Sequence, residues 1–175
     1  MIPVVADVFA LIDSGDVDGV RRLLADDPSA AEARDDQGLS PIVHAVYRGQ
    51  SEIAALLRPL DGWDRIALGG AEGLPAPGEW SPDGFTPLHI AAFAHNASAA
   101  RRLLEQGADP DVVARASFAR VTPLGTCAFA GANEVARVLL EHGADPAVSE
   151  VEGEAPADVA RANGNDELAA LLSGD

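Results

Sequence analysis

The chain has 175 residues, of which 47% are hydrophobic and 23% charged, a mixture that suits one soluble globular domain rather than a membrane protein. Its 28 acidic and 12 basic residues give a formal charge of −16, which repels nucleic acid and anionic membrane surfaces. All the basic residues are arginines, so no lysine is available for a Schiff base or a phosphate-binding loop.

The start of the chain carries no recognisable targeting signal. The stretch MIPVVADVFALID lacks a basic n-region and has Asp7 inside its apolar part, so we expect a cytoplasmic protein. The single cysteine, Cys127, excludes an internal disulfide and a cysteine-rich zinc module. Frequent Ala, Gly and Arg without Lys is typical of a high-GC bacterial genome.

A pattern that recurs every 33 to 36 residues predicts pairs of short helices. In most copies a capping residue before proline starts the first helix, a glycine ends it, and an apolar stripe marks the second helix. A single copy cannot bury its apolar faces alone, so the copies must stack into a solenoid. The copies begin at Ala6, Ser40, Thr86, Thr122 and Ala155, and only the 46-residue step from Ser40 to Thr86 breaks the period.

The third copy, TPLHIAA followed by LLEQGADP, resembles the ankyrin repeat, a β-turn finger with two antiparallel helices. The resemblance implies an all-α ankyrin repeat solenoid of about five helix-turn-helix repeats with β-turn fingers. It also implies that His89 forms structural hydrogen bonds between repeats. In the second copy Val43 holds that position and His44 follows it, so the same bonds are not expected there. The single domain, 1–175, divides into repeats at about 3–34, 35–58, 81–114, 117–149 and 150–175.

The irregular insertion at residues 58–80 has two interpretations. Asp61–Leu68 can form one or two helical turns with Trp63, Ile66 and Ala67 inward, while GGAEGLPAPGE is a loop. In that case 59–80 is a degenerate half-repeat that lost its second helix. The alternative is a disordered surface loop, and a helix with an exposed Trp63 would count against the half-repeat.

Catalytic and metal-binding patterns are not apparent. Cys127 lies at a small-residue position of a first helix, which favours a packed thiol over a nucleophile. No pair of the four histidines has the spacing of a helical zinc site. Acidic pairs fall in turns, where they form a solvated edge, although the dense Glu150, Glu152 and Glu154 could contact a basic partner. We therefore predict no cofactor, no metal and no enzyme activity.

Aromatic residues concentrate on one surface. The resemblance implies a concave contact surface made of fingers and first helices, and four of the five Phe and the only Tyr fall on it. Such a patch is typical of a protein-binding site. We therefore predict a protein partner, which the sequence does not identify, and no binding to nucleic acid or membranes. Alternatively, Phe85 and Phe93 pack against each other within one repeat. The predicted partner-binding residues are Leu39, Tyr47, Arg48, Trp80, Asp83, Phe85, Phe93, Phe118, Val121, Phe129 and Glu152.

Two further functional hypotheses remain open. In the first, the protein associates with itself, and a second copy or the inserted loop with Trp63, Leu74 and Trp80 covers the patch, although a monomer is the primary expectation. In the second, it is a hydrolase or a ligand-binding enzyme that uses acids around the insertion, such as Asp61 and Asp64. Nothing in the sequence arranges those acids as an acid/base pair.

Overall fold

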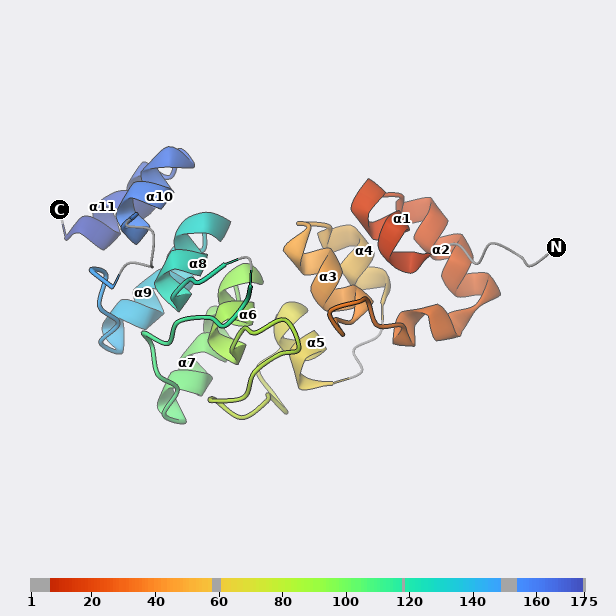
Figure 1. Ribbon diagram of the computed structural model, residues 1–175, viewed down its shortest axis with the longest axis horizontal. Helices are drawn as coiled ribbons and strands as arrows, with labels where there is room; N and C mark the ends of the chain where they lie inside the picture. The colour runs from red at the N-terminus through yellow and green to blue at the C-terminus, as the bar shows by residue number, and fades with distance from the viewer. Residues whose placement is uncertain (1–6, 58–60, 118, 149–153, 175) are drawn as a thin grey trace.

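The computed structural model describes residues 7–57, 61–117, 119–148 and 154–174. In these ranges the regular structure consists of α-helices and one short 3-10 helix, which confirms the predicted all-α class. The helices follow one another in chain order from the red N-terminal end to the blue C-terminal end (Figure 1). Crossing a bilayer would need a longer and more apolar helix than any in these ranges.

The helices form two layers, one made of the first helices of the units and the other of their second helices. Each first helix packs on the next first helix along the stack, and each except α5 also packs on a second helix of its own unit. The first layer contains α1 (Val8–Ser14), α3 (Pro41–Tyr47), α5 (Gly62–Ala67), α6 (Pro87–Phe93), α8 (Pro123–Ala130) and α10 (Pro156–Ala162). The second layer contains α2 (Val17–Asp26), α4 (Ser51–Leu56), α7 (Ala97–Glu105), α9 (Asn133–Glu141) and α11 (Asp166–Ser173), and the 3-10 helix η1 (Pro28–Glu32) follows α2.

Capping residues account for where the first helices begin and end. The Thr122 hydroxyl accepts a hydrogen bond from the backbone N–H of Gly125 at 3.1 Å, and Pro123 fills the first helical position of α8. Gly131 closes α8 with a φ of 75°, a left-handed conformation that glycine adopts without strain. His95 takes the same role after α6 with a φ of 53°, which is uncommon for a residue with a side chain.

Helix α5 lies between α3 and α6 in the first layer, so the predicted helix in the insertion is present. The Asp61 carboxylate caps it by accepting a hydrogen bond from the Asp64 N–H at 3.0 Å. Ile66 is fully buried, Ala67 is buried, and Trp63 is half-buried against the core. All three residues that were predicted to point inward therefore lie in the core or pack against it.

A loop instead of a second helix follows α5. Arg65 donates a hydrogen bond to the carbonyl oxygen of Gly73 at 3.1 Å, and a Cβ atom on Gly62 would lie only 2.6 Å from that oxygen. The loop therefore folds back tightly over the start of α5. Glu72 pairs with Arg102 of α7 at 3.2 Å, so this loop also lies beside the second layer.

Candidate functional site

Four aromatic side chains from three helices and one loop form a continuous group, which we call the aromatic cluster: Tyr47, Phe85, Phe93 and Phe129. The Tyr47 ring lies 4.7 Å from that of Phe93 and 5.9 Å from that of Phe85, measured between ring centroids. Phe93 lies 5.6 Å from Phe85 and 6.5 Å from Phe129. Most of the pairs are edge-to-face, the arrangement that aromatic quadrupoles favour. The predicted grouping of these residues is therefore present.

Exposure divides the aromatic cluster into a buried and an open end. Phe129 is 68% exposed, whereas Phe93 and Tyr47 are partly buried and Phe85 is only 1% exposed. The expectation that Phe85 faces a partner is thus wrong for its side chain. The Phe85 ring packs against Phe93, which is the alternative the sequence left open, and it also packs against Tyr47 of the preceding unit, which the sequence did not predict.

Two other predicted contact residues are also buried. Leu39 is 5% exposed and belongs to the core, and Asp83 is 9% exposed. The loops that carry them also lie close together, since a Cβ atom on Gly38 would lie 3.0 Å from the side chain of Pro82 in the next loop. Neither residue lies on the open surface that its repeat position predicted.

The remaining predicted residues are distributed differently. Arg48 is exposed and its Nε lies 2.8 Å from the Asp13 carboxylate. Val121 is half-buried, and half-buried Trp80 lies under the guanidinium of Arg115, which is 4.0 Å from the ring centroid. The predicted contacts Phe118 and Glu152 lie outside the described residues.

Two polar atoms lie buried beside the aromatic cluster. Within the described part of the chain, Tyr47 Oη and Asp83 Oδ2 are the buried side-chain atoms without a well-formed hydrogen bond. Burial, and after it the nearby Asp83 carboxylate, raise the pKa of Tyr47 well above its usual range. Burial also raises the pKa of Asp83, against a 2.5 Å hydrogen bond from the Ser81 hydroxyl. Tyr47 of α3 is thereby coupled to the loop before α6.

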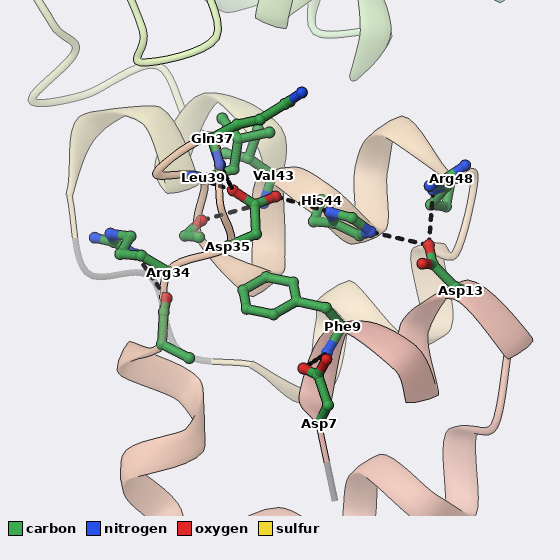
Figure 2. Close-up of polar contacts among 12 residues, drawn as sticks. Asp7, Phe9, Asp13, Arg34, Asp35, Gln37, Leu39, Val43, His44 and Arg48 are labelled. Atoms are coloured by element: carbon green, nitrogen blue, oxygen red, sulfur yellow. Dashed lines mark hydrogen bonds and ion pairs between the residues drawn. The ribbon is translucent and has the colours of Figure 1, made fainter.

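His44 joins the first two helix pairs through carboxylates on both sides (Figure 2). Its Nδ1 lies 3.1 Å from Asp35 Oδ2 and its Nε2 lies 3.0 Å from Asp13 Oδ1, while the Phe9 ring packs edge-on at 5.2 Å. His44 thus has both ring nitrogens within hydrogen-bonding distance of a carboxylate oxygen. Its hydrogen bond holds the pKa of Asp13 below its usual value. The sequence indicated only that His44 lies one position later in its repeat than His89 does in the third repeat.

His89 forms the structural hydrogen bonds that its sequence context implied. Its Nδ1 accepts a hydrogen bond from the Thr86 N–H at 3.2 Å, and its Nε2 lies 2.9 Å from the carbonyl oxygen of Val121. The second contact crosses from α6 to the loop before α8. Because the ring is completely buried, its pKa is lowered to about 4, and it is neutral at physiological pH.

The described residues offer little for catalysis or for metal binding. Burial of Cys127 in α8 raises the pKa of its thiol far above its usual value, so it stays protonated and unreactive. Among the described residues, no group of three or more His, Cys, Asp or Glu could hold a metal ion. Asp64 is fully buried and accepts a hydrogen bond from the Ser40 hydroxyl, which gives this acid a structural setting.

Comparison with known proteins agrees with the geometry. Residues 8–114 match the family model described as ankyrin repeats (3 copies), and this match covers more than half of the chain. The matched region runs from α1 through α7, so it includes α5 and the loop that follows it. The search of curated proteins returned no match.

Proposed function

Since the chain belongs to the ankyrin repeat family, whose members are generally protein-interaction modules, we propose that it is a non-catalytic module whose protein partner binds around Phe129. The single observation that carries this proposal is the exposure of Phe129, 68% of whose surface meets solvent. A single exposed apolar residue needs no explanation. Here, however, the Phe129 ring contacts Phe93, and the Phe93 ring contacts Tyr47, so the exposed ring is part of a larger aromatic group.

The rigidity of the site favours binding. Phe129 stands on α8, and the rings beneath it are held by edge-to-face contacts, so little side-chain entropy is lost when a partner covers them. Covering one phenylalanine side chain contributes about 1.5–3 kcal/mol. The partner contact thus centres on Phe129 and the exposed part of Phe93.

Self-association is the less favoured alternative. Two copies would each bring a formal charge of −16 to the contact, and like charges of that size oppose a dimer. The inserted loop does not cover the cluster either, because Leu74 packs on the core, Trp80 lies against Arg115, and Phe129 stays exposed. Concentration-dependent light scattering that is abolished by Phe129→Ala would instead favour the dimer.

Site-specific photo-cross-linking tests the proposal. Benzoylphenylalanine placed at position 129 should trap a discrete protein from a lysate of the native cells, and Phe93→Ala should reduce the yield of that adduct. Leu68 provides the matched control, because it is an exposed large apolar residue outside the aromatic cluster, at 37% exposure. Identical adducts from positions 129 and 68, or no adduct from position 129, would contradict the proposal.

A further inference from the structure

The residue that directly precedes the cap of a first helix differs from unit to unit: it is Phe85 before α6 and Glu154 before α10. Phe85 directly precedes the capping residue of α6, and its ring lies between Tyr47 and Phe93 at 5.9 and 5.6 Å. Those two rings occupy the seventh position after the capping residues of α3 and α6. In this unit, the residue before the cap therefore packs between the seventh positions of its own unit and the preceding one.

The same register places a carboxylate next to the open ring. Glu154 directly precedes Ala155, the capping residue of α10, and Phe129 is the seventh residue after the cap of α8. By sequence register, Glu154 therefore corresponds to Phe85, and Phe129 corresponds to Tyr47. Glu154 and Phe129 are both exposed, so the unit of α10 has an exposed carboxylate at the register position where the unit of α6 has a buried ring.

An aromatic face next to a carboxylate is complementary to a guanidinium group. Arginine stacks flat on an aromatic ring by cation–π attraction and also donates hydrogen bonds to a carboxylate. A purely apolar partner would instead desolvate Glu154 without giving it a hydrogen bond, which costs free energy. We propose, on the basis of the partner site proposed above, that the partner presents an arginine side chain that stacks on Phe129 and pairs with Glu154.

The overall charge distribution favours the same kind of partner. Acidic residues exceed basic ones by 28 to 12, and six of the arginines are already paired with carboxylates in the described residues. A further arginine, Arg115, lies over Trp80. A basic segment of a partner protein is therefore attracted to this surface, whereas an acidic segment is repelled.

Titration with short peptides tests this inference directly. Acetyl-tetraarginine amide is the probe, and its tetracitrulline analogue is the neutral control of nearly the same shape. In ¹H–¹⁵N spectra, tetraarginine should shift the amides of Phe129 and Glu154 more than those of other acidic surface residues, such as Asp18 and Glu105. Tetracitrulline should bind at least several-fold more weakly. Shifts spread evenly over all acidic surfaces, or equal binding of both peptides, would overturn the inference.

Three variants separate the contributions of the ring and of the charges. Phe129→Leu keeps an apolar side chain but removes the π face, and Glu154→Gln removes the charge, so each should weaken tetraarginine binding by about two- to five-fold. Arg120→Gln removes an exposed positive charge two residues before the α8 cap and should leave the binding unchanged or strengthen it. Unchanged affinity in both Phe129→Leu and Glu154→Gln would overturn the inference.

The outcome is distinguishable from that of the proposed function. If position 129 yields a specific cross-linked protein but tetraarginine shows no preference for Phe129, the partner site remains and only its arginine specificity fails. If tetraglutamate binds there better than tetraarginine, the charge assignment is reversed and the inference is wrong.

Discussion

The His89 Nε2 atom and the Val121 carbonyl oxygen lie 2.9 Å apart and tie helix α6 to the loop that starts the next unit. His89 also bonds the Thr86 N–H, so both of its ring nitrogens have partners in a fully buried setting. This one side chain satisfies backbone groups in two successive units. Its loss would leave buried polar groups in both units without partners, which is the more costly outcome for a hydrogen bond.

The first prediction concerns the stability that His89 contributes. His89→Ala should lower the free energy of unfolding by at least about 1–3 kcal/mol, because it leaves the Val121 carbonyl without its partner. Urea denaturation followed by circular dichroism measures this change. His142→Ala is the control, since His142 is exposed and its side chain lies 2.8 Å from the Val138 carbonyl oxygen of its own helix rather than bridging two units. Equal losses in the two variants would show that the inter-unit bond is unimportant.

The second prediction concerns the pH dependence that the same group imposes. Burial lowers the pKa of His89 from 6.5 to about 4, so between these values the unfolded chain binds a proton that the folded chain does not. The stability from neutral His89 is complete above pH 6.5 and falls by about 3 kcal/mol as the pH drops toward 4. The advantage of the wild type over His89→Gln should therefore shrink across that interval. An advantage that is constant with pH would contradict this.

A third prediction concerns the contact between Asp13 and His44. The hydrogen bond from His44 is the largest cause of the lowered pKa of Asp13, and Arg48 contributes less. In His44→Leu the pKa of Asp13 should rise toward its usual value, and in Arg48→Gln it should rise less, as ¹³C NMR titration of the carboxyl would measure. The stability from Asp13 is present above its usual pKa and is lost as the pH falls through the lowered one. This acid-dependent part should shrink in His44→Leu.

A fourth prediction compares two phenylalanines of the aromatic cluster. Phe85→Ala should cost about 3–5 kcal/mol of unfolding free energy, because it opens a cavity between Tyr47 and Phe93. Phe129→Ala should change stability by only about 0.5 kcal/mol, because that ring is largely exposed. Comparable losses in thermal or urea denaturation would mean that the open end of the cluster is packed in solution.

A fifth prediction concerns the tight contact of the loop with α5. Gly62→Ala would place a methyl group 2.6 Å from the Gly73 carbonyl oxygen, so it should cost about 1–3 kcal/mol through a forced shift of the loop. Gly78→Ala is the matched control in the same loop, because a Cβ atom there meets nothing within 4 Å. It should be neutral or slightly stabilising. A neutral Gly62→Ala would mean that the loop is not packed on α5.

Local signals in the sequence were sufficient for the helices and their caps. Thr-Pro pairs, turn glycines and apolar stripes act over a few residues, so they predicted the first and second helices of the repeats, while α5 was one of two interpretations of the insertion. Trp63 and Ile66 could be assigned inward because their spacing follows the helical period. The family membership followed from the same repeated motif.

The sequence could not reveal which of the residues predicted to lie on the contact surface have exposed side chains. Phe85 and Val121 occupy equivalent positions, yet Phe85 is buried because Tyr47, 38 residues earlier, lies where its ring can pack. The partners of His44 lie 9 and 31 residues away in Asp35 and Asp13, which no short-range pattern encodes. Long-range packing between units therefore decided the parts of the site that the repeat pattern did not.

The missing second helix after α5 also has a consequence for how the protein unfolds. Stability in a solenoid spreads from unit to unit through contacts between neighbours, so a thinner interface marks a place where cooperativity can break. Here α4 and α7 are separated in the second layer by a loop, and the stack is continuous mainly through α3, α5 and α6. Hydrogen exchange is thus expected to show weaker coupling between the two blocks on either side of α5 than between other neighbouring units, with the aromatic cluster supplying part of the remaining coupling.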